Sequence, residues 1–172
     1  MNKFKYLFQV FIALLVLSIS GCDGLFESKP QDVLIEYLNA DTMGDHKKAY
    51  SHISSENKKN KPYELYAAEK SKYSYSELAK LFIENTTHKI ENVEVSGDTA
   101  KIRVDTTTVN MEFITREIAN AGFRAATTGK TFIDIQKDLA EKYKTQKLPL
   151  HNYKSNHKLI KEKDGWKVVL NY

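Results

Sequence analysis

The stretch Thr99-Ala-Lys-Ile-Arg-Val-Asp-Thr-Thr-Thr108 decides the fold class, because its side chains alternate strictly in character. One set is small, aliphatic or hydroxylated: Ala100, Ile102, Val104, Thr106 and Thr108. The intervening set is charged or polar: Lys101, Arg103, Asp105 and Thr107. Successive side chains of a strand point to opposite faces of its sheet, so the pattern predicts a strand with one buried face.

Two hairpins are predicted around this pattern. Thr87–Val95 is rich in β-compatible residues, and Ser96-Gly-Asp98 is a typical hairpin turn between it and the alternating strand. Near the C-terminus, Tyr153–Glu162 and Trp166–Tyr172 flank Lys163-Asp-Gly165, which is also a hairpin signal. The strands are therefore expected to pair antiparallel.

Helices are predicted before the strands. Pro30 suits the first turn of a helix, where a missing N–H has no cost, and Gly44 ends or follows that helix. Its apolar face is formed by Val33, Leu34, Tyr37 and Leu38. Asp45 is a good N-cap for a second helix. The apolar side of this second helix is formed by Ala49, Tyr50 and Ile53.

The next segment is expected to alternate between loop and helix. Ser54–Lys61 is polar and basic and is interpreted as an exposed loop, and Pro62 restarts a helix around Tyr63–Lys72. Ser74 and Glu77 have the spacing of a capping box. The helix behind this box carries Leu78, Leu81 and Phe82.

A further helical region, 111–147, separates the two predicted hairpins, and Pro149 marks its end. Its apolar stripe has helical spacing and consists of Phe132, Ile135, Leu139 and Tyr143. Helices followed by antiparallel strands predict an α+β fold. We expect N-terminal helices packed on one face of a curved, cone-like antiparallel sheet, with a helical insert between strands.

The first 21 residues have the layout of a secretory signal peptide. Lys3 and Lys5 give a positive start, Leu7–Ile19 is almost unbroken in its apolar character, and small residues precede Cys22. The apolar run has about 13 residues, whereas a membrane-spanning helix needs about 20. Cleavage after position 21 removes two lysines and no acid, which lowers the formal net charge from +4 to about +2. Such a small charge is not a nucleic-acid signature.

The ending Ile19-Ser20-Gly21-Cys22 resembles the bacterial lipobox. The resemblance implies cleavage before Cys22 and attachment of diacylglycerol to its sulfur, usually with a further fatty acid such as palmitate on the new N-terminus. Cys22 is the only cysteine, so it cannot form an internal disulfide, and a free thiol is the alternative. Two acyl chains give lasting membrane attachment. Residues 22–29 are then a lipidated tether, and 30–172 is a single domain.

Asp23 follows the lipobox directly and is similar to the inner-membrane retention signal of enterobacterial lipoproteins. In such a cell the domain faces the periplasm from the inner membrane. In a single-membrane bacterium the domain faces the cell exterior, and Asp23 has no sorting role. The sequence leaves both hosts open.

Three segments of the domain resemble the nuclear-transport-factor-2-like (NTF2-like) superfamily, in the form found in small bacterial lipoproteins. They are Pro30-Gln-Asp-Val-Leu-Ile-Glu-Tyr-Leu38, Gly44-Asp-His-Lys-Lys-Ala-Tyr50 and Lys163-Asp-Gly-Trp-Lys-Val168. The helical region 111–147 departs from the simplest pattern of the family.

The resemblance implies a cystatin-like α+β cone with an apolar pocket between helices and sheet. The candidate pocket-lining residues are Tyr37, Tyr50, Tyr66 and Trp166. Aromatic side chains with a polar atom suit a pocket wall, and plain core is the alternative for all four.

No motif for catalysis or metal binding stands out. Thr127-Thr-Gly-Lys-Thr131 lacks the first glycine of a phosphate-binding loop, because Arg124 occupies that position, and is interpreted as a connection between helices. Asp105 is interpreted as a solvated strand carboxylate. Five histidines are interpreted as surface residues, since their spacing does not match a metal site: His46, His52, His88, His151 and His157. The basic cluster Lys58, Lys59 and Lys61 is a solvated loop or a contact for anionic lipid.

The expected function is non-enzymatic binding of a partner protein or a small apolar ligand by a lipid-anchored extracytoplasmic domain, with no cofactor, metal or nucleic acid. Two alternatives stay open. One is an enzyme of the isomerase or dehydratase kind that uses the cone pocket. The other is an immunity or exclusion lipoprotein that blocks an incoming toxin or phage at the membrane. One fold can serve all three, so the site has to discriminate between them.

Lipidation at Cys22 is directly testable. Cells that express the chain in the presence of labelled palmitate should incorporate label into the wild-type protein, because the lipobox directs acylation there. Cys22→Ser should incorporate none, since serine offers no thiol for the thioether. Equal labelling of the two proteins would contradict the assignment.

Overall fold

The computed structural model describes residues 28–70, 77–125 and 129–170 and confirms the predicted α+β class. An open, four-stranded antiparallel sheet in the order β1-β2-β3-β4 follows a series of helices. The elements are α2 (Pro30–Met43), α3 (His46–Ser51), α4 (Ser55–Asn60), α5 (Tyr63–Lys70), α6 (Glu77–Glu84), β1 (Thr87–Ser96), β2 (Thr99–Val109), α7 (Met111–Ala125), α8 (Phe132–Thr145), β3 (Leu150–Glu162) and β4 (Gly165–Val169). The predicted signal peptide, Cys22, Asp23 and Ser74 lie outside the described residues.

Both predicted hairpins are present. Gly97 and Gly165 occupy the turns with φ of 54° and 105°, in the left-handed region where glycine meets no steric penalty. The long strands β2 and β3 pair along their whole shared length, from Thr99↔Ile160 to Val109↔Leu150. They are connected through the hairpin of α7 and α8, which is the predicted helical insert. β3 begins at Leu150, three residues before the predicted Tyr153, because its pairing with β2 continues to Val109.

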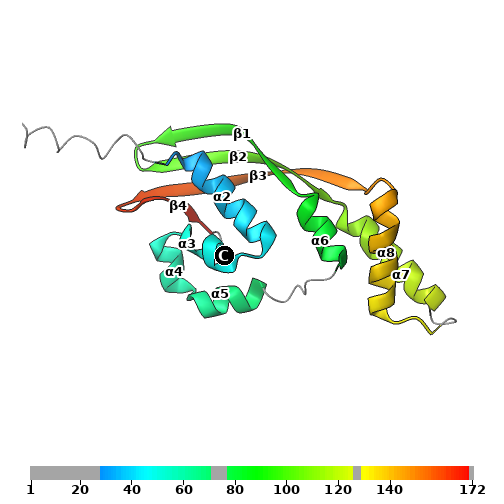
Figure 1. Ribbon diagram of the computed structural model, residues 1–172. Helices are drawn as coiled ribbons and strands as arrows, with labels where there is room; N and C mark the ends of the chain where they lie inside the picture. Colours follow the sequence, from blue (N-terminus) through cyan, green and yellow to red (C-terminus); the bar gives the residue numbers. More distant parts are fainter. Residues whose placement is uncertain (1–27, 71–76, 126–128, 171–172) are drawn as a thin grey trace, which may run out of the picture.

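The alternation along β2 is confirmed. Ala100, Ile102, Val104 and Thr106 are all buried, whereas Lys101 and Arg103 are exposed. Figure 1 shows α2 to α6 on one side of the sheet, and the buried side chains of β2 belong to clusters with these helices. We call the helix-covered face the inner face of the sheet and the opposite face the outer face.

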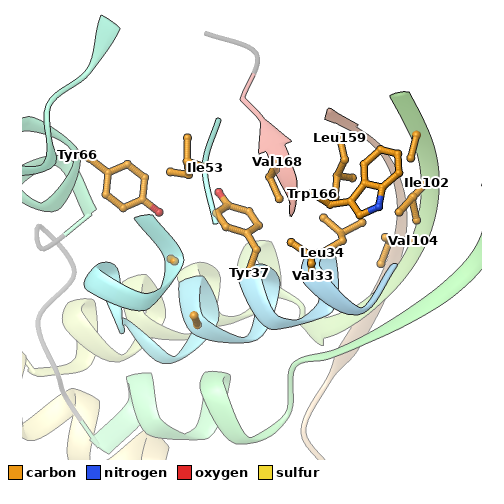
Figure 2. Close-up of a cluster of buried hydrophobic side chains, with 13 residues drawn as sticks. Val33, Leu34, Tyr37, Ile53, Tyr66, Ile102, Val104, Leu159, Trp166 and Val168 are labelled. Carbon is orange, nitrogen blue, oxygen red and sulfur yellow. The ribbon is translucent and has the colours of Figure 1, made fainter. Parts of the chain in front are cut away.

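The first core cluster lies where α2 crosses the inner face (Figure 2). Leu34 from α2, Val104 from β2 and Leu159 from β3 are completely buried.

The predicted boundaries of α2 and the predicted N-cap of α3 are confirmed, but α3 ends at Ser51, so Ile53 lies outside this helix and forms a bridge with Val168 instead. Gly44 ends α2 with φ of 73°, and the Asp45 carboxylate accepts a hydrogen bond from the Lys48 N–H at the start of α3.

The second core cluster lies at the other end of β2, between α6, α7 and α8. Its buried members are Leu78, Val109, Ile114, Ile135, Leu139, Tyr143 and Leu148. The predicted stripe on α8 is correct except at Phe132, whose side chain is 59% exposed. Phe132 is the first residue of α8, so no preceding turn of that helix and no neighbouring element covers it.

The prediction that Ser54–Lys61 is an exposed loop is wrong. Ser55–Asn60 forms α4, capped by the buried Ser54, whose Oγ accepts a hydrogen bond from the Asn57 N–H. Asn57 is also buried, and its side-chain amide exchanges two hydrogen bonds of 3.0 Å with the backbone of Leu170. These bonds attach α4 to the end of β4. The polar composition of Ser54–Lys61 predicted exposure because the partner that buries Asn57 is 113 positions away in the sequence, beyond the reach of any local pattern.

Trp166 should be a major contributor to stability. It is 7% exposed and lies against Ile102 and Leu159 in the first core cluster (Figure 2). Trp166→Ala leaves a cavity in that cluster, and we expect the free energy of unfolding to fall by roughly 3–5 kcal/mol. Urea denaturation measures the change, with Phe123→Ala as control, because Phe123 is 82% exposed. Similar losses in the two variants would contradict this role of Trp166.

Candidate functional site

A strip of polar side chains crosses the inner face of the sheet, from the region between the two core clusters to the part of β3 beside the first cluster. We call it the polar strip, and it consists of Thr86, His88, Thr106, Thr108, Ser155 and His157. It arises on β2 because Val104, the last aliphatic residue of the first cluster, is followed on the same face by two threonines. Buried polar groups need partners, so the strip is held by hydrogen bonds instead of close apolar contact.

His88 stands at the centre of the polar strip. Its Nε2 lies 3.0 Å from Thr42 Oγ1 at the end of α2, and its Nδ1 lies 3.0 Å from Thr106 Oγ1 on β2. A neutral imidazole satisfies both contacts, since one nitrogen donates and the other accepts. Burial lowers the pKa of His88, and the nearby Asp41 carboxylate opposes that shift. His88 therefore joins a helix to the sheet in its neutral form.

Ser155 and His157 form a second polar pair on the strip. Ser155 Oγ lies 2.8 Å from His157 Nε2, within the reach of a nucleophile and its general base. Burial, followed by the proximity of His88, lowers the pKa of His157, so the imidazole is uncharged and able to accept a proton. β4 pairs only with Lys158–Glu162 of β3, so among the described strands none covers the edge beside this pair.

The end of α2 carries a third polar group. Asp41 accepts a hydrogen bond of 3.1 Å from Tyr66 Oη and one of 2.8 Å from Lys70 Nζ. Burial raises the pKa of Tyr66 far above its usual range, with further contributions from Tyr37 and Asp41. The phenol therefore stays protonated and donates. These contacts attach α5 to α2, which is a structural role.

A groove with a volume of about 320 Å³ runs between α7 and α8. Its apolar lining comes from Ala121, Ile135 and Leu139. Its charged lining consists of Glu117, Arg124, Lys130, Asp138 and Lys142. The volume falls at the low end of the roughly 300–1,000 Å³ typical of ligand pockets. The groove is thus an apolar slot with charges of both signs around it.

The charges of the groove are largely paired. Glu117 accepts a hydrogen bond from Lys142 Nζ and another of 3.1 Å from Tyr143 Oη. The bond from Lys142 is the main reason that the pKa of Glu117 is lowered. Lys130 and Asp138 form a second ion pair. Since these charges neutralise one another, the apolar lining is the part of the groove available to a ligand.

The four candidate pocket residues lie in and beside the first core cluster. Tyr37, Tyr66 and Trp166 are buried members, whereas Tyr50 is half-buried against the cluster and donates a hydrogen bond of 3.0 Å to the Lys61 carbonyl. Other residues line the α7–α8 groove. Contact of the four with a ligand stays a prediction, as do the roles of Cys22 and Asp23, which lie outside the described residues.

The interpretation of the histidines as surface residues is wrong for four of the five. His46, His52, His88 and His157 are half-buried, and Nδ1 of His46 is shielded from solvent. Burial is the main cause that lowers the pKa of His52, His88 and His157. Spacing alone missed Ser155 as well, although its position two residues before His157 on a predicted strand implies a shared face. Among the described residues, no group of three or more histidine, aspartate, glutamate or cysteine side chains is arranged to hold a metal ion.

Asp105 differs from the solvated carboxylate that the sequence predicted. Its Oδ1 is shielded from solvent and has no hydrogen-bond partner among the described residues. The cross-strand neighbours of Asp105 are Lys89 and Lys154.

The basic cluster and the connection before α8 both have structural contacts. Lys58 donates a hydrogen bond of 3.0 Å to the Ser51 carbonyl, and Lys61 pairs with Glu69, so the predicted basic cluster is built into α4 and its neighbours. Thr131 caps α8 through a capping box with Asp134, which agrees with a connection between helices. Residues 127 and 128 of that connection lie outside the described residues.

Comparisons with known proteins return few matches. No protein-family model matches the sequence, and no curated protein matches it. Among solved structures, the chain is similar to a Campylobacter jejuni protein named "Putative NTF2-like transpeptidase", with 20% sequence identity and a TM-score of 0.42. The match covers 84% of this chain and 100% of that one.

Within the described parts of the chain, no helix is both long enough and apolar enough to cross a membrane.

Three half-buried histidines, His52, His88 and His157, should make stability depend on pH. Their pKa values are lowered from the ordinary 6.5 by burial, so the unfolded chain binds protons more readily than the folded protein. Their full contribution is present above that value, and the free energy of unfolding should fall as the pH drops below it. Urea denaturation from pH 7.5 to about 5 measures this fall.

His88→Gln should reduce the fall, because it removes one of the three protonation sites and keeps an amide that can bond to the threonines. The matched control is His151→Gln, at an exposed position of β3. A decline of unchanged steepness in His88→Gln would show that this imidazole does not contribute to the pH dependence.

Proposed function

We propose that this chain is a membrane-anchored extracytoplasmic lipoprotein with a non-enzymatic NTF2-like binding domain. Its ligand is a small molecule with an apolar body, or an apolar side chain of a partner protein, held in the groove between α7 and α8. An immunity or exclusion role is one form of the partner option. Cys22 carries the lipid in this proposal, and Asp23 retains the protein in the inner membrane where the host has two membranes.

The anchor rests on the sequence alone. A short apolar run ends in Ile19-Ser20-Gly21-Cys22, and this cysteine is the only one in the chain. The lipid confines the domain near the bilayer and raises its effective concentration toward membrane-bound partners. A domain that binds a membrane-bound partner therefore binds it more fully when it is anchored to the same membrane.

The observation that carries the binding role is the composition of the α7–α8 groove. Its apolar lining is formed by the half-buried Ala121 beside the buried Ile135 and Leu139, while the charges next to it are already paired, as in Glu117 with Lys142. Burial of apolar surface contributes about 25 cal/mol per Å². An apolar ligand therefore gains this energy without breaking the ion pairs. Proton transfer by Glu117, in contrast, is disfavoured because its hydrogen bonds stabilise the carboxylate.

Filling the groove should abolish binding. Ala121 lines it and is half-buried, so Ala121→Phe places a ring in the slot without removing a core side chain. The probe is 1-anilinonaphthalene-8-sulfonate, an apolar fluorophore with one anionic group. We expect the native protein to bind it saturably, and Ala121→Phe to weaken that binding at least about tenfold.

The matched control is Ala68→Phe, which adds the same ring at an exposed position of α5. It should bind the probe as the wild type does. Equal binding by the wild type and both variants would place the apolar site elsewhere and remove the support for this groove.

The Ser155–His157 pair favours an enzyme as the second candidate. A hydroxyl 2.8 Å from an uncharged imidazole has the geometry of an activated nucleophile. A complete triad also needs a group that orients the imidazole. Among the described residues, no carboxylate bonds to the other ring nitrogen of His157. The pair is therefore a weaker basis for function than the groove.

Ester hydrolysis separates the two candidates. If Ser155 is a nucleophile, the protein should hydrolyse p-nitrophenyl acetate, and Ser155→Ala and His157→Asn should each reduce the rate by about 10²-fold. His151→Asn is the control on the same strand. A rate that none of the three variants changes would exclude this pair as a catalytic group.

A further inference from the structure

The outer face of the sheet holds a hollow with a volume of about 310 Å³. Its lining includes Asn92, Glu94, Lys101, Arg103, Asn156 and Lys158, all with exposed side chains. We call it the basic hollow. Figure 1 shows the helices from α2 to α6 on the opposite side of the sheet, so none of these described helices covers it. It is also separate from the α7–α8 groove and goes beyond the function proposed for that groove.

The strand register concentrates positive charge in the basic hollow. Lys101 on β2 lies directly opposite Lys158 on β3, and Arg103 follows two residues along on the same face. Like charges directly opposite each other destabilise a strand pair. The one acid of the hollow is Glu94, opposite Lys101 on β1, so three cations face a single carboxylate.

Neighbouring cations are neutralised, whereas those of the basic hollow are not. Lys154 pairs with Glu91, and Lys167 lies 2.8 Å from Asp164. In the parts of the chain that the structure describes, neither Lys101 nor Lys158 forms an ion pair. The opposed lysines therefore leave an excess of positive charge in the hollow.

The polar groups of the hollow match a compact oxyanion. Arg103 directs its Nε toward Asn156 Oδ1 at 3.4 Å, which leaves both terminal nitrogens of the guanidinium without a partner among the described residues. A planar guanidinium binds the oxygens of a phosphate in a bidentate manner, and lysines add point charges. Asn92 donates to Glu94 at 2.9 Å and so holds the carboxylate to one side.

We propose that the basic hollow binds a phosphate group, with Arg103 as the bidentate donor and Lys101 and Lys158 as flanking charges. The group belongs to a soluble phosphoester or to a phosphomonoester lipid headgroup. Binding relieves the repulsion between the opposed lysines, and this relief gives the site its preference for a multiply charged anion.

The test uses the purified full chain in a nonionic detergent. One arm titrates inorganic pyrophosphate by calorimetry, and the other titrates dihexanoyl phosphatidic acid. Lys101→Gln and Arg103→Gln should each weaken binding at least about tenfold, since each removes a charge-assisted bond. The matched control, Lys59→Gln, removes an exposed lysine from α4 on the helical side and should bind as the wild type does.

Each outcome has a defined meaning. Saturable pyrophosphate binding with this variant pattern supports a soluble ligand, and binding of the short-chain lipid alone with the same pattern supports a headgroup. Absence of binding in both arms, or equal weakening by Lys59→Gln, overturns the proposal. Near-ultraviolet circular dichroism of each variant verifies that the fold is retained. Neither result bears on the binding role proposed for the α7–α8 groove or on the proposed lipid anchor, which have their own tests.

Discussion

The pairing of β2 with both of its neighbours is the constraint on which the rest of the structure depends. β2 is hydrogen-bonded to β1 on one side and to β3 on the other, and its two ends belong to different core clusters. A one-residue slip in this register would move every buried side chain of β2 to the outer face. The aliphatic residues of β2 therefore hold α2 at one end of the sheet, and Val109 holds the α6–α8 group at the other.

The polar strip is the direct consequence of having two clusters on one sheet. Apolar contacts are interrupted between them, so hydrogen bonds of defined length replace packing there, as at His88 between Thr42 and Thr106. Such bonds are directional, and a lost partner leaves a buried polar group that costs about 1–3 kcal/mol. The strip therefore holds its side chains in fixed orientations, which is what either an acid–base pair or a specific contact requires.

The two faces of the sheet differ in their electrostatics for a physical reason. On the inner face, burial removes water from the histidines and favours their neutral forms. On the outer face water is present, so charged residues are tolerated even where Lys101 and Lys158 oppose each other. The groove of α7 and α8 lies apart from both, in the helical insert between β2 and β3. The domain thus carries three chemically different surfaces, two on its sheet and one on its helical insert.

Local patterns were sufficient for the elements that depend on neighbours in the chain. The alternation of β2, the left-handed Gly44 after α2 and the hairpin glycines Gly97 and Gly165 were all predictable, because periodicity and backbone conformation act over a few residues. Tertiary structure alone decided which polar residues are buried. Asn57 and Ser54 became part of the interior through contacts of the α4 segment with the end of β4, and polar composition carries no information about so distant a partner. The basic hollow also depends on pairing between β1, β2 and β3, which brings together side chains that are far apart in the sequence. The Ser155–His157 pair is different, because its two-residue spacing on one strand is local and was visible in the sequence.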